Sequence, residues 1–309
     1  MLDTSAIEAP GQERLASFLT SGVVGGTGTA RKQLASDAGV RLFDFSFPSP
    51  GGDRVTSYLV LPSGASKHPT IIFHHWGFGS RRSFLAEAKA YARMGVASLL
   101  VDAPEMGARG RGLPRLDNAD IALAYLKRAV VDVRAALDVL GQAPEVDAAR
   151  VAYVGHSLGA AILGHLAALE DRFRGLVGMA PTGRISRTWS LRPTAEYLQA
   201  VAPLDGVNFI GSATRPILLQ FGRADGFVPE REAEILVRAA PRDTTAAYYG
   251  AGHALDDDAR YARSAWLMDV LAHRNAAAPN AFRGVSLPLK ERLQGAFAEA
   301  AVRTLRRSD

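Results

Sequence analysis

The sequence contains no cysteine in its 309 residues. Disulfide bonds, zinc sites built from thiolates and a catalytic thiol are therefore excluded. It also lacks an apolar run long enough to cross a bilayer, so we expect no membrane span. Residues 1–14 carry Asp3 and Glu8 and lack the apolar segment of a secretory signal, so we expect a cytoplasmic protein.

A block of charge of one sign is missing as well. The 36 basic and 31 acidic residues give a net charge of +5, and they are spread along the chain. Nucleic-acid binding typically needs clustered Lys and Arg with interleaved aromatic residues, so we expect no nucleic-acid partner. With 48% hydrophobic residues, the chain is long enough for one large α/β domain with additional segments, or for two domains.

The most informative stretch is residues 151–160. An apolar segment, Val151–Val154, leads into Gly155-His156-Ser157-Leu158-Gly159, and a helical pattern follows. Strand, sharp turn and helix form the context of the G-x-S-x-G nucleophile elbow, in which glycines avoid collisions around a strained serine. A chance loop is the alternative, but the flanking pattern favours the elbow. We expect the helix to begin at the serine, so that its amides face developing negative charge.

An acid and a base follow in the order that such a serine needs. The predicted strand Ile217–Phe221 runs into a glycine-flanked turn that contains Asp225, and the strand Ala246–Tyr249 runs into a loop that contains His253. Taken separately, Asp225 is also typical of a residue that stabilises a turn, and His253 is also typical of a residue in a surface loop. Their placement at successive strand ends instead favours a triad of Ser157, Asp225 and His253.

An oxyanion hole needs two backbone donors. We expect one to be the N–H of Leu158 and the other to be the N–H of Trp76 or Gly77, in the loop after the strand Thr70–His74. The pair His74 and His75 raises the alternative of a metal site. Adjacent residues on a strand point to opposite faces, however, and no carboxylate lies nearby in sequence, so we expect neither a metal nor a cofactor.

Further side chains are expected to contact the substrate. Besides the triad, the residues expected at the substrate site are His75, Phe78, Glu105, His156 and Trp189. A set of arginines either receives an acidic or carrier-bound acyl group or forms an ordinary solvated surface, which we favour. This set is Arg109, Arg111, Arg115, Arg184, Arg187 and Arg192.

The apolar patterns also predict the architecture. Val40–Phe47 and Val55–Leu61 predict a hairpin that begins the sheet, and from residue 70 strands alternate with helices. This predicts an α/β fold: a mostly parallel sheet flanked by helices, with its site at the carboxyl ends of the strands. Residues 181–215 interrupt the alternation and are interpreted as a cap or lid.

The two ends of the chain are interpreted as extensions. Residues 1–39 form an N-terminal extension with a short helical pattern, Gln12–Leu19, and a glycine-rich linker, Gly22–Gly28, that lacks the ending of a phosphate loop. Residues 276–309 form a helical tail. We expect its apolar stripe, Leu289, Leu293 and Phe297, to dock on the body; packing against a second subunit, in a homodimer, is the alternative.

Between about Val40 and His273 the chain resembles the α/β-hydrolases, and it is similar to their dienelactone hydrolase-like and serine-esterase branches. The resemblance rests on His-x-x-Gly-x-Gly from His74, the Val131–Leu137 segment, Gly-His-Ser-Leu-Gly, Gly-x-x-Asp-x-x-Val-Pro and Gly-x-Gly-His. Dienelactone hydrolases have cysteine where this chain has Ser157, so their lactone substrate does not carry over. The usual His-Gly start of the oxyanion loop is altered to His-His-Trp-Gly.

The resemblance implies an α/β-hydrolase domain over residues 40–275 and a small-molecule acyl substrate. It implies cleavage of an ester or thioester through an acyl-enzyme. Acyl transfer or cyclisation on the same triad is the alternative among enzymes. A catalytically silent binding protein on this fold is the alternative outside them.

Overall fold

The computed structural model describes residues 15–16, 19, 28–37, 39–64, 66–110, 112–273, 282, 285 and 288–307. The predicted glycine-rich linker therefore lies outside the described residues, except for Gly28, and so does Arg111. Of the predicted N-terminal helical pattern, Leu15 and Leu19 are described and are buried in the core.

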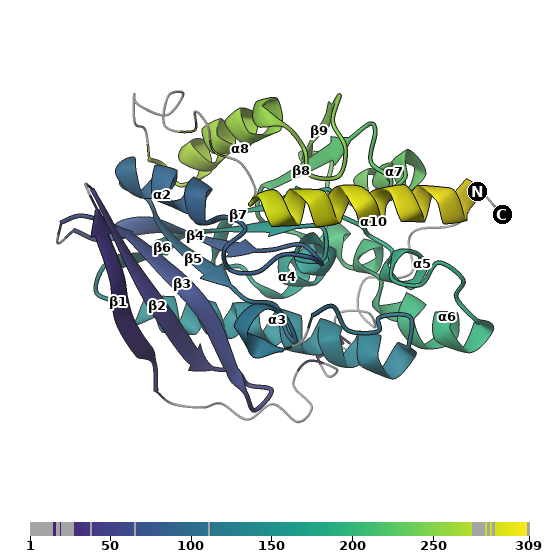
Figure 1. The fold of residues 1–309 in the computed structure, drawn as a ribbon, viewed down its shortest axis with the longest axis horizontal. Helices are drawn as coiled ribbons and strands as arrows, with labels where there is room; N and C mark the ends of the chain where they lie inside the picture. The colour runs from purple at the N-terminus through teal and green to yellow at the C-terminus, as the bar shows by residue number, and fades with distance from the viewer. Residues whose placement is uncertain are drawn as a thin grey trace.

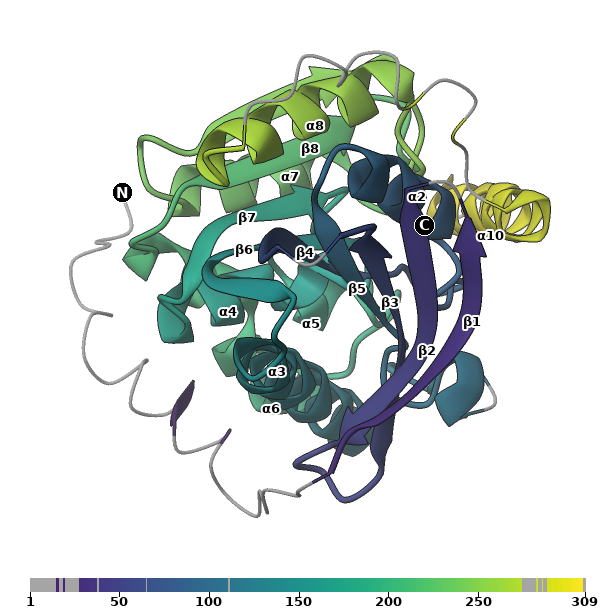
Figure 2. The ribbon, with the colours of Figure 1, turned by 90° about the vertical axis from the view of Figure 1, so that its left-hand side faces the viewer.

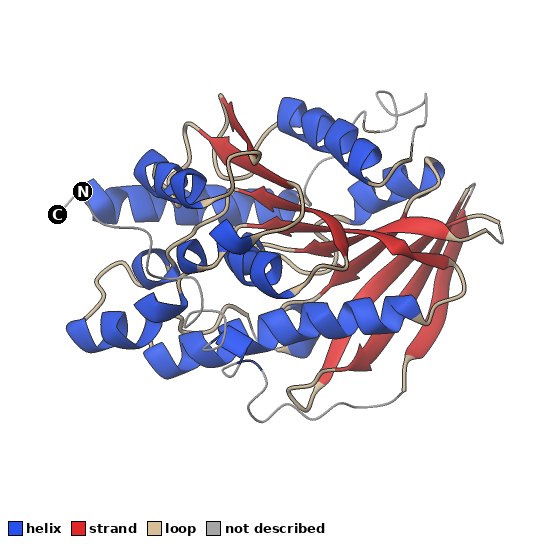
Figure 3. Ribbon diagram, turned by 180° about the vertical axis from the view of Figure 1, so that it is seen from behind, coloured by secondary structure: helices blue, strands red, loops and turns tan. Residues whose placement is uncertain are grey.

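A twisted sheet runs through the molecule (Figure 3). In the described part of the chain it has nine strands in the order β1-β2-β3-β5-β4-β6-β7-β8-β9. From β5 to β9 along this order the neighbours are parallel, whereas β1, β2, β3 and β5 pair antiparallel. The mostly parallel sheet is thus confirmed. The strands are β1 Ala30–Asp37, β2 Val40–Pro48, β3 Arg54–Pro62, β4 His68–His74, β5 Ala97–Val101, β6 Val146–His156, β7 Phe173–Met179, β8 Ile217–Gly222 and β9 Thr245–Tyr249.

The start of the sheet differs from the prediction. The hairpin of β2 and β3 is confirmed, but the sheet begins before Val40, because β1 pairs with β2 from Ala30 opposite Ser46 to Asp37 opposite Val40. This edge strand carries polar and charged side chains and only one large apolar residue, Leu34. Edge strands often carry charge that discourages further pairing, and such a sequence lacks the apolar alternation of a buried strand.

Helices cover both faces of the sheet (Figure 2). Alternate strand residues supply the two cores: Ile72 and Tyr153 contribute to one, Ile71 and Val154 to the other. This two-sided burial explains why the parallel strands read as nearly continuous apolar runs. The first core packs against α3 Ala119–Gly141, α4 Leu163–Leu169 and α7 Glu230–Ala239, and the second against α2 Leu85–Arg93 and α8 Asp257–Val270.

The segment between β7 and β8 packs on the body. It contains α5 Ile185–Thr188, α6 Ala195–Val201 and short 3₁₀ turns at Ala202–Leu204, Gly206–Asn208 and Ile210–Ser212. Tyr197 donates a hydrogen bond to the Leu116 carbonyl over 2.8 Å, and Ser186 donates to Asp205 over 2.6 Å. Burial raises the pKa of Asp205 to about 6. These contacts fix the segment beside the strand ends.

The last helix, α10 Leu289–Arg307, crosses the same end of the molecule and is yellow in Figure 1. It docks on the body, but the predicted docking face is wrong, because Leu293 and Phe297 are 52% and 76% exposed. Buried Glu291 and Gly295 face the body instead. Hydrogen bonding by a carboxyl group and close approach at a glycine, rather than an apolar stripe, decide this orientation. No helix in the described ranges has the length and apolar character needed to span a membrane.

Candidate active site

Ser157 lies at the end of β6 in a strained turn. Its φ is 52°, and its N–H donates to the Met179 carbonyl over 2.8 Å. A Cβ added at Gly155 would lie 2.6 Å from the Gly159 carbonyl oxygen, and one at Gly159 would collide with the His74 carbonyl. Only glycine therefore permits this turn at both positions, as the sequence motif predicts.

The chain after the serine is wound more tightly than we expected. The residues after Ser157 form a turn, then a 3₁₀ segment at Ala160–Ile162, and α-helix begins only at Leu163. The prediction that the helix begins at the serine is therefore wrong. The Gly159 N–H is held by the carbonyls of His156 and His75, at 2.9 and 3.1 Å, which tightens the turn. Within the described part of the chain, the Leu158 N–H meets no hydrogen-bond acceptor.

Asp225 and His253 come together at the ends of β8 and β9. The Asp225 Oδ2 accepts a hydrogen bond from His253 Nδ1 over 2.8 Å, and the two side chains are only 2% and 4% exposed. Since a carboxylate accepts, Nδ1 carries a proton, and in the neutral ring Nε2 then has the lone pair. Asp225 Oδ1 accepts from the N–H groups of Phe227 and Val228 at 2.7 and 2.9 Å. The carboxylate is thus fixed on both sides.

A glycine allows these two loops to touch. A side chain at Gly222 would collide with the Gly252 carbonyl, and Ala224 N–H donates to the Ala251 carbonyl over 2.9 Å. The close contact of the backbones brings residues that are 28 positions apart in sequence within hydrogen-bonding distance.

The loop after β4 is tied to the elbow. The His75 carbonyl accepts from Gly159, and the Trp76 carbonyl accepts from Gly79 over 3.0 Å. In the part of the chain that the structure describes, the N–H groups of Trp76 and Gly77 find no acceptor, and both residues line the same cavity as Leu158. Both therefore remain candidates for the second oxyanion donor.

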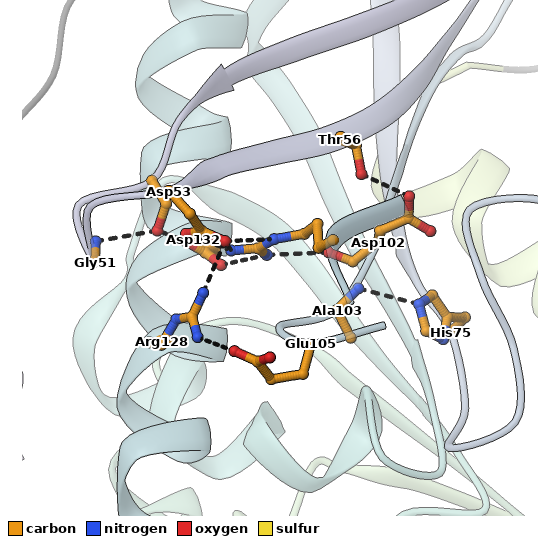
Figure 4. Close-up of polar contacts among 11 residues, drawn as sticks. Gly51, Asp53, Thr56, His75, Asp102, Ala103, Glu105, Arg128 and Asp132 are labelled. Atoms are coloured by element: carbon orange, nitrogen blue, oxygen red, sulfur yellow. Dashed lines mark hydrogen bonds and ion pairs between the residues drawn. The ribbon is translucent and has the colours of Figure 1, made fainter. Parts of the chain in front are cut away.

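His75 is part of the support of this loop. Its Nε2 accepts the Ala103 N–H over 3.0 Å (Figure 4), so Nδ1 carries the proton and donates to the Trp76 carbonyl over 2.7 Å. Burial lowers the pKa of His75, which keeps the ring neutral. Both ring nitrogens are occupied, so His75 fixes the loop and leaves no polar atom for a substrate.

His156 and Glu105 also have other partners. His156 is buried, stacks on Trp76 with ring centres 5.8 Å apart, and donates from Nε2 to the His253 carbonyl over 2.9 Å. Burial lowers its pKa to about 3, so the ring is neutral. Glu105 has a φ of 62° and pairs with Arg128 (Figure 4). Contrary to the prediction of substrate contacts, His75, Glu105 and His156 are not among the described residues that line the cavity beside Ser157.

Sequence reasoning missed a partly buried ionic network that contains Arg109 and Glu105. The side chain of Arg109 is 1% exposed and binds Asp53 and Asp132 at 3.0 and 2.6 Å. Arg128 adds a second bond to Asp53 (Figure 4). Burial raises the pKa of Asp132, and Arg109 opposes this shift. Arg184, likewise, is paired with Glu232 over 2.5 Å. Internal carboxylates thus satisfy two of the arginines that we considered for an acidic substrate.

A cavity of about 480 Å³ lies over Ser157 and His253. Phe78 and Trp189, which the sequence analysis expects to contact the substrate, line it. The C-terminal helix supplies a wall that the sequence analysis did not foresee. The other described lining residues are Trp76, Gly77, Leu113, Pro114, Arg115, Leu116, Asp117, Leu158, Ala180, Thr182, Thr188, Leu191, Phe227, Val228, Ala298, Ala301 and Val302.

Residues 31–202, more than half of the chain, match the acetyl xylan esterase (AXE1) family. The chain belongs to this family. The matched region of this hydrolase family contains Ser157 and ends before Asp225 and His253.

Solved structures share the fold of this family member. An acetyl xylan esterase from Paenibacillus sp. R4 has a TM-score of 0.69 at 17% identity, covering 84% of this chain and 92% of that one. Acetyl xylan esterase 1 from Thermoanaerobacterium sp. JW/SL YS485 has a TM-score of 0.68 at 18% identity, covering 84% and 93%. At these identities the likeness concerns the fold, which is that of an α/β-hydrolase.

A further similarity is to a protein that is named as a transferase. Polyketide transferase ATR5 of Stachybotrys chlorohalonatus (strain IBT 40285) is 32% identical over 140 residues, which are 45% of this chain. The match spans 44% of the length of that relative.

Proposed function

We propose that this member of the acetyl xylan esterase family cleaves a carboxylic ester or thioester through an acyl-enzyme on Ser157. The observation that carries the proposal is the hydrogen bond between Asp225 and His253 at the cavity that also contains the strained Ser157. A serine hydroxyl needs a base to accept its proton, and the base needs an acid to fix its tautomer.

In the proposed acylation, Ser157 Oγ attacks the carbonyl carbon and its proton moves to His253 Nε2. The new bond joins Oγ to carbon, the bond to the alcohol or thiol breaks, and His253 returns the proton to that leaving group. Asp225 stabilises the imidazolium. The Leu158 N–H and the N–H of Trp76 or Gly77 bind the oxyanion. Water activated by His253 then releases the acid.

The test combines turnover with labelling. We expect the purified protein to hydrolyse a p-nitrophenyl ester and to react with a fluorophosphonate, and Ser157→Ala to lose both activities. Ser190 and Ser212 offer matched serine-to-alanine controls outside the elbow, and we expect both variants to retain activity. Labelling that survives Ser157→Ala would place the nucleophile elsewhere.

Acyl transfer is the second candidate, and the similarity to a polyketide transferase favours it. In this reaction a bound alcohol or amine replaces water in the second step. Adding increasing concentrations of an alcohol during ester turnover distinguishes the two functions. Transfer predicts that the ester of the added alcohol replaces the free acid as the main product, whereas hydrolysis predicts that the acid persists.

A further inference from the structure

Helix α10 is built into the candidate site. Glu291 is buried and accepts hydrogen bonds from the Trp76 indole N–H over 3.1 Å and from Ser83 Oγ over 2.5 Å. The Gly226 N–H donates to Glu299 over 2.7 Å. A Cβ at Gly295 would collide with the Trp76 ring, so the helix lies directly on that ring. These contacts fix α10 to the loop that supplies a candidate oxyanion donor.

The same helix lines the cavity with small side chains. The side of the cavity that α10 forms consists of Ala298, Ala301 and Val302. The apolar side chains on the other sides include Phe78, Leu113, Leu191, Phe227 and Val228. The hydroxyls of Thr182 and Thr188 lie 3.0 Å apart, within hydrogen-bonding distance of each other. The side chains of Arg115 and Asp117, which pair at 3.4 Å, are 81% and 52% exposed to solvent. A bound sugar would need many hydrogen-bond partners, and a lining made mostly of apolar side chains does not supply them.

The volume exceeds the needs of an acetyl group. If each of its three non-hydrogen atoms takes the ~30 Å³ of one water molecule, an acetyl group fills on the order of 90 Å³. The cavity of about 480 Å³ is several times larger. Pockets of this size and apolar character typically enclose a drug-sized ligand.

We propose that the site takes esters with a hydrophobic chain or ring larger than acetyl, and that the small side chains of α10 set its size limit. This inference rests on the proposed function for its chemistry. Its geometric basis, an apolar cavity that Ala298, Ala301 and Val302 line on one side, is independent of which residue is the nucleophile.

Two ester series determine which part of the substrate occupies the cavity. p-Nitrophenyl esters from acetate to dodecanoate vary the acyl group, and acetates of alcohols from ethanol to dodecanol vary the alcohol. We expect kcat/KM to rise in one series by about fourfold per methylene, the increment for burying a CH₂ group, until the cavity is full. The inference would be overturned if the acetate were the best substrate of the acyl series and ethyl acetate the best substrate of the alcohol series.

Variants of the helix test the size limit. Ala298→Leu and Ala301→Leu each place a larger side chain at the cavity, and leucine keeps a high helix propensity. We expect each to lower the kcat/KM ratio of a long over a short substrate by on the order of tenfold, the effect of overpacking a filled site. Ala300→Leu is the matched control, because Ala300 lies on the same helix, is exposed as Ala301 is, and does not line the cavity. An unchanged ratio in both cavity variants would overturn the role of α10.

A binding measurement separates this inference from the proposed function. Calorimetric titration of Ser157→Ala with primary alcohols from ethanol to octanol requires no catalysis. Suppose that the natural protein turns over no ester, but octanol binds Ser157→Ala more tightly than ethanol does and the added change Ala301→Leu removes this difference. The inference then stands and the proposed function fails. If Ser157-dependent hydrolysis occurs without any length preference, the function stands and the inference fails. Neither turnover nor length-dependent binding would overturn both.

Discussion

Replacing Asp225 by asparagine tests how the base is oriented. The Oδ1 atom accepts two backbone N–H groups, so an asparagine must keep its oxygen on that side. Its NH₂ group then faces His253 Nδ1, which at present donates to Asp225 Oδ2 over 2.8 Å. The ring must move its proton to Nε2 to accept from this NH₂ group. The lone pair needed to deprotonate Ser157 is thereby lost.

The expected loss is about 10⁴-fold in kcat, the effect of the same change in serine proteases, or about 5 kcal/mol of transition-state stabilisation. Folding should change much less, since the backbone bonds to the side-chain oxygen persist and one charge-assisted hydrogen bond weakens by about 1–2 kcal/mol. Steady-state turnover of a p-nitrophenyl ester measures kcat, and urea unfolding measures the free energy of unfolding.

A neighbouring aspartate provides the control. Asp256 caps α8 by accepting from the Ala259 N–H over 2.9 Å, and asparagine caps a helix as well as aspartate does. We therefore expect Asp256→Asn to retain full activity. If Asp225→Asn folds normally and keeps kcat within tenfold of the unmodified protein, the proposed role of Asp225 is refuted.

Three further predictions concern the surroundings of the site. Glu291→Gln keeps an acceptor for Trp76 and Ser83, and because burial raises the pKa of Glu291, it should be at least as stable as the natural protein at pH 8. Glu291→Ala should lose about 1–3 kcal/mol of unfolding free energy and part of kcat/KM, since it leaves two buried donors unsatisfied; equal behaviour of the two variants would contradict this. Arg109→Met leaves Asp132 buried without its cation and should cost about 3–5 kcal/mol by urea unfolding, whereas a loss below 1 kcal/mol would show that the network is not required. Burial lowers the pKa of His165 to about 4. Between pH 6.5 and 4 the unfolded chain therefore binds a proton that the folded chain does not, so the free energy of unfolding decreases as the pH is lowered. His165→Gln should therefore lose about 2 kcal/mol less than the natural protein between pH 7 and pH 4.5, and identical pH profiles would be inconsistent with this assignment.

The sequence predicts best the features that depend on local pattern. Apolar runs such as Ile217–Phe221 mark strands buried on both faces, and the glycines around Ser157 mark a turn that other residues cannot form. The pairing of Asp225 with His253 was predictable because parallel strands end at one edge of the sheet.

Features that depend on tertiary partners were not predictable in this way. β1 is polar and gains its place through backbone pairing with β2. The stripe of Leu293 and Phe297 suggested a docking face, but α10 docks through Glu291, whose partners Trp76 and Ser83 lie more than 200 positions earlier in the sequence. Glu105 follows a buried strand as substrate-binding residues often do, yet its carboxylate pairs with Arg128.

Mass spectrometry of a trapped intermediate tests the central claim most directly. The protein is mixed with a p-nitrophenyl ester, quenched in acid within the first turnover and digested, and the peptides are mapped. We predict that the acyl group is found on Ser157, and that no acyl adduct forms with Ser157→Ala. An acyl group on any other residue, or turnover by Ser157→Ala at the rate of the natural protein, would contradict the account.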